Sequence, residues 1–469
     1  MIPGQKPREI AARVLARRRA GKEFTETLLE RALTEAAGPT SEGREPRPGL
    51  LDLDRRLCQE LVYGVVRWQA TLDWLIALKT QGRPQKPGLQ DLLRLGLYQI
   101  FWLDRIPDHA AVHETVAMAK RAGFGPQAGF VNAVLRGFLR EAVATKIRLA
   151  DLKTAQPALG WSQPDWLVAR WSKHWGNERT RALLEWNNLP AKLYARVNTL
   201  RTEAGKLLAQ WRGEGVDYDF LTRDWTGESM VFELKSHPPL TTLESFRQGG
   251  FYIQDPSTLL AVRELDPRPG ETVLDLCAAP GGKTTFIAQL MDNEGHIVAG
   301  DVAEERLKLV RENCTRLGVT CVEAVTARAQ IVETGARKVV TSETTLASRQ
   351  ATPSGSPPPQ RFDKILVDAP CSNTGVLRRR VDLRWRIQLE EIPRLQSTQL
   401  SLLRRAAGLL KPGGLLVYST CSLEPEENSE VISQFLSEDS GFKLARDRAL
   451  LPFTDGVDGA FVARLYKLA

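Results

Sequence analysis

The chain has few cysteines, and their spacing narrows the classes of protein it can belong to. Its 469 residues include six cysteines, and none of them stands in a CxxC pair. This spacing argues against a zinc site and against a disulfide framework, and it fits a reducing cytoplasm. The six are Cys58, Cys277, Cys314, Cys321, Cys371 and Cys421.

Long apolar runs are also missing. No run reaches the roughly 18 residues that a membrane-spanning helix needs. The N-terminal stretch MIPGQKPREIAARVLARRRAGKEF contains no apolar core of the kind that a signal peptide has. We therefore expect a cytoplasmic protein that binds neither a membrane nor a metal ion.

Positive charge is concentrated in the first third of the sequence. Residues 1–150 contain 24 Lys and Arg against 16 Asp and Glu, whereas the remaining residues contain 40 of each. The formal net charge of +8 therefore comes from the N-terminal region. A basic module is typical of proteins with a polyanionic partner such as nucleic acid, although a surface charge that only keeps the protein soluble would give the same count.

The spacing of apolar residues divides the chain into three regions. Up to residue 150 apolar residues recur at helical intervals, as in RRLCQELVYGVVRWQATLDWLIALK, which predicts an all-helical bundle. The next hundred residues mix helical and strand patterns and predict a small α+β domain. From residue 251 strands alternate with helices, which predicts a doubly wound α/β domain with a parallel sheet. We place the domains at 1–150, 151–250 and 251–469.

Residues 326–360 interrupt the strand–helix alternation with a tract that ends SRQATPSGSPPPQ. A stretch so rich in Pro, Ser and Gly, and so poor in apolar residues, cannot build a core. We therefore expect a mobile surface insertion at this point of the α/β domain.

The sequence LDLCAAPGGKTT, residues 274–285, predicts a ligand-binding turn between a strand and a helix. Its glycines would let the backbone approach a ligand, and the following helix offers free N–H groups. Open α/β sheets bind ligands at this edge, but the turn matches neither the P-loop nor GxGxxG, and a plain strand–helix turn is the alternative. The candidate cofactor-binding residues are Cys277, Ala278, Ala279, Pro280, Gly281, Gly282 and Lys283.

Asp301 ends the next strand, 20 residues beyond Gly281. A nucleoside-binding α/β fold places an acid there to hold the ribose hydroxyls, so we expect Asp301 to bind the cofactor. The same side chain could cap the helix that begins at AEERL, and the two roles are compatible.

Two later loops follow strands and carry cysteines. They are DAPCS, residues 368–372, and STCS, residues 419–422. Asp368 would face the same crevice as the turn, and we count it as a candidate cofactor-binding residue. A carboxylate there could also hydrogen-bond the amino edge of a cytosine. Taken alone, Cys421 could equally be a core residue, because free cysteine is commonly buried.

These motifs, in this order, resemble those of the S-adenosylmethionine-dependent RNA 5-methylcytosine methyltransferases, which are marked by the APGGK turn, the DAPCS loop and the TCS loop. In the helical region, LVYGVVRWQATLDWLI and RIPDHAAVHETVAMAKRAG are similar to a NusB-like RNA-binding domain. The combination resembles the RsmB/Sun group over nearly the whole chain except residues 326–360. It implies S-adenosylmethionine as cofactor, RNA as partner and a cytosine of small-subunit (16S) ribosomal RNA as target. We expect a monomer.

The resemblance also implies a role for each loop cysteine. Cytosine C5 is a poor nucleophile, and a thiolate that adds to C6 makes C5 able to attack a sulfonium methyl group. The family pattern gives this catalytic role to Cys421 and gives Cys371 a role in releasing the product. A free thiol is only a few per cent ionised near neutral pH, so we expect local activation, with Lys283, helix N-termini and arginines as candidates.

The sequence departs from the family pattern in two places. Thr326 stands where relatives usually have an acid near the adenine, which puts that contact in doubt. In the loop SNTGVLRRRVDLRW, Asn373 stands where relatives favour Gly. The arginines of this loop suit contacts to RNA phosphates, although a solvated basic loop is the alternative. They are Arg378, Arg379, Arg380, Arg384 and Arg386.

Three other functions stay open from the sequence alone. One is a transfer-RNA cytosine-C5 methyltransferase. Another is an RNA-binding or ribosome-assembly factor with impaired activity, which the change at Thr326 favours and the intact turn and cysteines oppose. The third is a nicotinamide-dependent dehydrogenase, which shares the fold and the ribose acid but lacks GxGxxG and gives no reason for two loop cysteines.

Overall fold

The computed structural model describes residues 7–37, 52–326 and 361–468. The chain forms two compact units, each built from two segments of sequence. These are Met1–Leu189 with Leu377–Ile387, and Pro190–Val376 with Gln388–Ala469. Nearly all of the predicted insertion, residues 327–360, lies outside the described residues. Within the described stretches, no helix combines the length and the apolar character that crossing a membrane requires.

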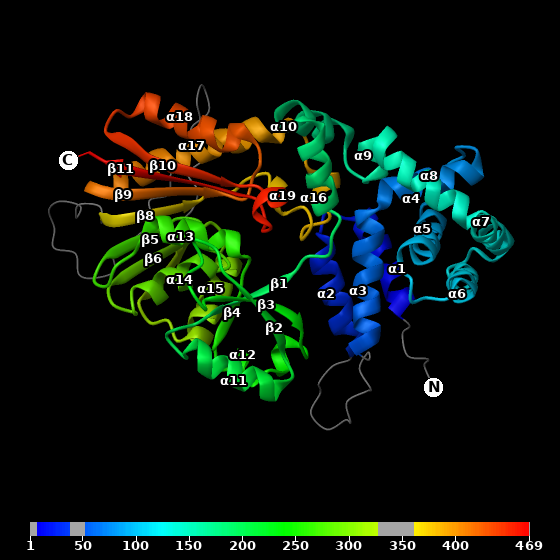
Figure 1. Cartoon of the computed structure of the whole chain (residues 1–469), viewed down its shortest axis with the longest axis horizontal. Helices are drawn as coiled ribbons and strands as arrows, with labels where there is room; N and C mark the ends of the chain where they lie inside the picture. The colour runs from blue at the N-terminus through cyan, green and yellow to red at the C-terminus, as the bar shows by residue number, and fades with distance from the viewer. Residues whose placement is uncertain (1–6, 38–51, 327–360, 469) are drawn as a thin grey trace, which may run out of the picture. The chain divides into compact units, whose positions relative to one another are not determined.

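The first unit is all-helical, as the N-terminal spacing of apolar residues predicts (Figure 1). Its α-helices before residue 189 are α1 Pro7–Ala20, α2 Thr25–Ala37, α3 Asp52–Arg67, α4 Gln69–Thr80, α5 Pro87–Trp102, α6 Asp108–Arg121, α7 Ala128–Arg140, α8 Ala142–Ala155, α9 Pro157–Gly160 and α10 Asp165–Trp186. Helix α7 shows why they form: Val131, Val134, Leu135 and Phe138 recur every three or four residues and are buried on one face.

The later segment Leu377–Ile387 belongs to this helical unit. It contains the short helix α16, Leu383–Arg386. Arg384 is fully buried and donates at 2.9 Å both to the carbonyl oxygen of Asn187 and to Oδ1 of Asn188. Both Nη atoms of Arg384 therefore find hydrogen-bond acceptors within the unit.

The expectation that the loop arginines contact RNA phosphates is wrong for Arg378 and Arg384. Arg378 is 2% exposed, and its guanidinium carbon lies 3.9 Å from the ring centroid of Trp186. A phosphate cannot reach a guanidinium that is buried in this way. Of the five arginines in this loop, Arg380 is the exposed one.

The second unit, from Pro190 on, begins with a small α+β layer of the kind predicted for residues 151–250. Its four strands form an antiparallel sheet in the order β2-β3-β1-β4. The elements are β1 Leu193–Val197, α11 Ala204–Glu214, β2 Asp217–Leu221, β3 Val231–Ser236, α12 Glu244–Arg247 and β4 Phe251–Ile253. Trp211 of α11 anchors this layer, because its ring packs edge-on against Phe232 and Phe251 at centroid distances of 5.7 and 5.2 Å.

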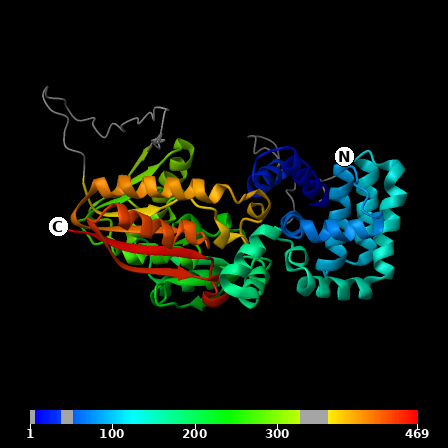
Figure 2. The ribbon, with the colours of Figure 1, turned by 90° about the horizontal axis from the view of Figure 1, so that it is seen from above.

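The rest of the second unit is a seven-stranded sheet covered by helices on both faces (Figures 1 and 2). Its strands are β5 Thr272–Asp275, β6 His296–Asp301, β7 Val322–Thr326, β8 Phe362–Asp368, β9 Leu410–Thr420, β10 Phe442–Leu450 and β11 Ala460–Lys467. The helices on one face are α13 Leu259–Leu265, α14 Gly282–Leu290 and α15 Glu304–Leu317, and those on the other are α17 Glu391–Leu409 and α18 Ser429–Glu438.

The strand order β10-β11-β9-β8-β5-β6-β7 confirms the predicted doubly wound sheet. Strands β5 to β9 are parallel, whereas β11 and β10 add an antiparallel edge. The sequence pattern does not predict this edge hairpin, because most side chains of β10 are exposed and the strand lacks an apolar run.

The topology also places the candidate site. From β5 the chain continues to β6 and β7 on one side, and then crosses to β8 and β9 on the other. At such a switch point the carboxyl ends of adjacent strands leave a crevice for a ligand. The turn after Asp275, the loop after Asp368 and the loop after Thr420 all start from this edge of the sheet.

Close packing in the helical unit generates a test of the fold. Gly64 of α3 lies against the Tyr98 ring of α5, and a Cβ at residue 64 would fall 1.9 Å from Cζ of that ring. Gly64→Ala should therefore lower the free energy of unfolding by about 1–3 kcal/mol, because the added methyl group forces packed neighbours apart. Chemical denaturation of the full-length protein, followed by circular dichroism, measures the change.

Gly129→Ala is the matched control for that variant. Gly129 is an exposed residue of helix α7, and no heavy atom lies within 4 Å of the Cβ that would be added there. Equal free energies of unfolding for the two variants would contradict the packing described for Gly64.

Candidate active site

The turn after β5 is held tightly by glycine. Gly281 has a φ of 101°, a conformation that favours glycine, and helix α14 begins at the next residue, Gly282. A Cβ on Gly281 would approach the Cα of Val310 in α15 at 3.2 Å. The turn therefore packs tightly against α15, and a larger residue at 281 would force Val310 to move.

The other residues of the predicted cofactor turn fix its shape. The N–H of Ala278 donates to the carbonyl oxygen of Gly300 at 2.9 Å, and the carbonyl oxygen of Pro280 accepts from Asn313 Nδ2 at 3.0 Å. Cys277 packs within the turn, and burial raises the pKa of its thiol. These contacts fix the shape of the turn at the edge of the sheet.

Asp301 lies beside this turn, at the end of β6. Its carboxylate is nearly buried and accepts from the N–H of Ala279 at 3.3 Å and from Arg306 Nη1 at 3.1 Å. It also accepts from the N–H of Ala303, just before α15, at 3.4 Å. A carboxylate has about four acceptor sites, so one remains for a ligand hydroxyl.

An acid also lies beside the end of β7, although the last residue of the strand, Thr326, is not one. The hydroxyl of Thr326 donates to Oε2 of Glu304 at 2.7 Å. Glu304 belongs to the first turn of α15. A carboxylate is therefore present at this strand end despite the departure from the family pattern at Thr326. It comes from helix α15 and not from the strand.

Asp275 is a fully buried acid at the end of β5. Its Oδ2 accepts from Thr284 Oγ1 at 2.6 Å, whereas Oδ1 has no hydrogen-bond partner in the described part of the chain. Burial raises the pKa of Asp275 to about 7, although the hydrogen bond from Thr284 acts in the opposite direction. The site therefore contains an unpaired buried acceptor.

Asp368 and Lys283 form an ion pair between the turn and the DAPCS loop. Nζ of Lys283 lies 2.7 Å from Oδ2 of Asp368, and Oδ1 accepts from Ser419 Oγ at 2.8 Å. Burial alone would lower the pKa of Lys283, but Asp368, Cys421 and Asp275 together raise it above its usual value. Lys283 is therefore a fixed positive charge next to the cysteine loops.

The two loop cysteines lie next to each other. Their Sγ atoms, of Cys371 and Cys421, are 3.3 Å apart. Cys371 is buried, whereas Cys421 is partly exposed. The structure thus brings together the two thiols that the sequence predicts as the catalytic pair.

Asn373 joins the two cysteines through its amide. Its Oδ1 accepts from Sγ of Cys421 at 3.1 Å, and its Nδ2 donates to the carbonyl oxygen of Cys371 at 2.6 Å. The φ of Asn373 is 60°, in the left-handed region where Asn is enriched among non-glycine residues. Asn373 therefore adopts a backbone conformation that glycine also favours and adds a contact to the thiol of Cys421.

The charges around the two thiols differ. The hydrogen bond with Cys421, burial, and the charges of Cys421 and Glu427 all raise the pKa of Cys371 well above its usual value. Cys371 is therefore protonated at neutral pH. Cys421, in contrast, interacts with the ammonium group of Lys283.

Besides Asp275, the sequence reasoning misses two more buried residues of this site. In the sequence, Glu427 looks like one of the acids that commonly begin a helix. In the structure its carboxylate is buried and accepts from the hydroxyls of Ser372 and Ser422. Arg196, in β1 of the small sheet, donates to the carbonyl oxygen of Gly282 at 2.8 Å. Local sequence gives no signal for either residue, because distant segments of the chain create their burial.

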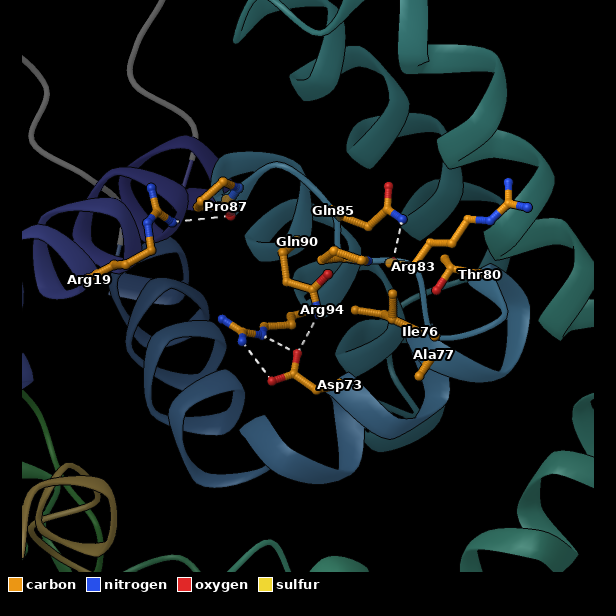
Figure 3. A pocket seen from close by; sticks show the side chains of 12 residues that line it. Arg19, Asp73, Ile76, Ala77, Thr80, Arg83, Gln85, Pro87, Gln90 and Arg94 are labelled. Carbon is orange, nitrogen blue, oxygen red and sulfur yellow. Dashed lines mark hydrogen bonds and ion pairs between the residues drawn. The ribbon is translucent and has the colours of Figure 1, made fainter.

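A separate hollow of about 360 Å³ lies in the helical unit, next to α4 and α5 (Figure 3). Its charges are largely paired, since Arg94 contacts Asp73 at 2.7 Å and Arg19 contacts Asp91. Figure 3 shows Arg83 pointing away from the Arg94–Asp73 pair. The described residues that line the hollow do not form a group of side chains suited to catalysis. Across the described residues, no group of three or more His, Cys, Asp or Glu could hold a metal ion.

Comparison with known proteins assigns each folded region to a family. Residues 262–466 match the family of 16S rRNA methyltransferases RsmB/F, and residues 5–140 match the NusB family. Residues 163–223 match the ferredoxin-like domain of RsmF/B-like methyltransferases. The matched order agrees with the helical region, the small α+β layer and the doubly wound sheet described above.

Individual relatives cover most of the chain. It is 37% identical to "Probable ribosomal RNA small subunit methyltransferase B" of Bacillus subtilis (strain 168), over 89% of this chain and 92% of that protein. It is 34% identical to ribosomal RNA small subunit methyltransferase B of Klebsiella pneumoniae, over 89% of this chain and 91% of that protein. A solved methyltransferase homologue from Pyrococcus horikoshii is 32% identical, with a TM-score of 0.53 over 66% of this chain and 97% of that chain. The chain therefore belongs to the RsmB/F family of small-subunit ribosomal RNA methyltransferases.

Proposed function

We propose that this protein transfers a methyl group from S-adenosylmethionine to C5 of a cytosine in small-subunit ribosomal RNA, through a covalent bond between Cys421 and C6. The observation that carries the proposal is the contact between two thiols, 3.3 Å apart, at the ends of adjacent strands. The names of the relatives favour ribosomal RNA over transfer RNA. The match to the NusB family and the basic charge of residues 1–150 support RNA binding by the helical unit.

The strand ends fit S-adenosylmethionine by the groups they offer. Asp301 keeps an acceptor site for a ribose hydroxyl beside the turn. Glu304, hydrogen-bonded to Thr326 at the end of β7, is the acid that would contact the adenine. When bound, the cofactor supplies a methyl group made electrophilic by its sulfonium.

In the proposed reaction the Cys421 thiolate bonds to C6, and the electron pair of the C5=C6 bond moves to C5. C5 then bonds to the methyl carbon as the S–CH3 bond breaks, and the electron pair of that bond stays on the cofactor sulfur, which leaves as a neutral thioether. A base removes the C5 proton, the C5=C6 bond forms again, and the Sγ–C6 bond breaks with the electron pair returning to sulfur. Lys283, held by Asp368, supplies the positive charge near the attacking sulfur.

Cys371 is suited to a step after methyl transfer. Its raised pKa, caused first by the hydrogen bond with Cys421 and then by burial, keeps its proton at neutral pH. A protonated thiol 3.3 Å from Cys421 can donate a hydrogen bond to the leaving thiolate. Cys371 would therefore help to break the Sγ–C6 bond.

An RNA-binding or assembly factor with impaired activity is the second candidate, and the missing acid at Thr326 is the observation that favours it. The hydrogen bond between Thr326 and Glu304 weakens this alternative, because it supplies an acid at the same strand end. Measured methyl transfer to ribosomal RNA separates the two functions.

Cys371→Ala should trap the covalent intermediate. Without the Cys371 thiol the bond between Cys421 and C6 would break slowly, so a protein–RNA adduct should accumulate with small-subunit ribosomal RNA and S-adenosylmethionine. Denaturing gel electrophoresis detects the adduct, and peptide mass spectrometry locates it at Cys421.

Cys321→Ala is the matched control, because Cys321 lies outside both cysteine loops, and it should give turnover without a stable adduct. An adduct that persists after Cys371 and Cys421 are both replaced by alanine would contradict the roles proposed for them.

Asp301→Ala should weaken the binding of S-adenosylmethionine by about 10-fold to 100-fold, because hydrogen bonds to a charged group contribute about 1.5–3 kcal/mol. Isothermal titration calorimetry on the full-length protein, without RNA, measures this affinity. Glu305→Ala is the control, since Glu305 is an exposed acid in the first turn of α15. Equal affinities for the two variants would rule out a ribose contact at Asp301.

A further inference from the structure

One buried carboxylate contacts both cysteine loops. Glu427 lies in the short turn Pro425–Glu427 and is 0% exposed. Its Oε1 accepts from the N–H of Ser372 at 2.8 Å and from Gln399 Nε2 at 3.1 Å. Its Oε2 accepts from the hydroxyls of Ser372 and Ser422. All four donors are neutral groups.

Each serine that donates to Glu427 is the direct neighbour of a loop cysteine. Ser372 directly follows Cys371, and Ser422 directly follows Cys421. The two serine hydroxyls also lie 3.0 Å from each other. Resting on the function proposed above, we propose that Glu427 is a positioning residue that sets the 3.3 Å separation of the two thiols.

Packing alone does not explain an acid at this position. Burying a carboxylate costs free energy unless hydrogen bonds compensate, whereas an apolar residue could fill the same volume without that cost. A carboxylate, however, offers two oxygens that accept only, and so it can receive donors from two loops at once. The four donors to Glu427 use this capacity.

The sheet and a neighbouring helix fix Glu427 in place. The hydroxyl of Tyr418, in β9, donates to the carbonyl oxygen of Glu427 at 2.6 Å. Gln399, in α17, donates both to the carboxylate and, at 3.0 Å, to the carbonyl oxygen of Pro370. A displacement of the loop of Cys371 relative to that of Cys421 would therefore break hydrogen bonds at Glu427.

The charge of Glu427 acts on the same pair of thiols. It is one of the groups that raise the pKa of Cys371, after the hydrogen bond with Cys421 and burial. Burial also raises the pKa of Glu427 itself, while the hydrogen bonds from Ser372 and Ser422 oppose that rise. Glu427→Gln removes the charge and keeps the shape, whereas Glu427→Ala removes both.

The experiment measures how close the two thiols are. Diamide oxidises two neighbouring thiols: the Sγ–Sγ bond forms, and two electrons and two protons pass to the diazene, which becomes a hydrazine. Mass spectrometry follows disulfide formation between Cys371 and Cys421 in the full-length protein, without RNA or cofactor. Each rate is divided by the rate at which iodoacetamide alkylates Cys371, which corrects for a changed thiolate fraction. Methyl transfer to small-subunit ribosomal RNA is measured in parallel as kcat and KM.

Glu427→Ala should slow disulfide formation and lower kcat by about tenfold or more, with KM for RNA unchanged, because a small misplacement of reacting groups is costly. Glu427→Gln should recover part of both rates, since its amide keeps one acceptor oxygen. Glu430→Gln is the matched control, because Glu430 is an exposed acid of α18, and it should behave as the unchanged protein.

Ser372→Ala and Ser422→Ala keep the test decisive if Glu427→Ala does not fold, because each removes one hydroxyl donor and no charge. Thiol rates and kcat equal to those of Glu430→Gln in all these variants would overturn the proposal. Slower disulfide formation, together with no adduct in Cys371→Ala, would support the role of Glu427 and refute the covalent mechanism. An adduct at Cys421 with unchanged disulfide rates would support the covalent mechanism and refute the role of Glu427.

Discussion

The parallel pairing of β8 with β9 is the constraint on which the active site depends. In their register Asp368 lies opposite Ser419, so the two loops leave the sheet at the same level. Cys371 and Cys421 follow within three residues, and their sulfur atoms reach 3.3 Å. Because side chains alternate between the faces of a sheet, a shift of one residue would turn Asp368 away from Ser419 and would separate the thiols.

The two thiols lie side by side, but the charged groups around them differ. The ammonium of Lys283, paired with Asp368, interacts with Cys421, whereas the buried carboxylate of Glu427 helps to keep Cys371 protonated. In the proposed mechanism Cys421 attacks, and Cys371 donates a hydrogen bond as the product leaves. The same arrangement explains why a second cysteine contacts the first, which a single catalytic nucleophile would not require.

Much of this architecture could be predicted, because local pattern determines it. The apolar runs before Asp275, Asp368 and Cys421 mark buried strands, and the residues that follow them meet at one edge of the sheet. The roles of Arg384 and Glu427 could not be predicted in this way. A buried arginine and a phosphate-binding arginine look alike in sequence, and so do a buried acid and an exposed one, because only contacts between distant segments distinguish them.

The central claim is that the methyl group is placed on C5 of a cytosine, and identifying the modified nucleoside tests it most directly. Unmodified small-subunit ribosomal RNA is incubated with the full-length protein and isotopically labelled S-adenosylmethionine, digested to nucleosides and separated by liquid chromatography with mass spectrometry. The covalent chemistry proposed for Cys421 and Cys371 predicts labelled 5-methylcytidine. Label found on an amino group, on a ribose hydroxyl or on another base would contradict it.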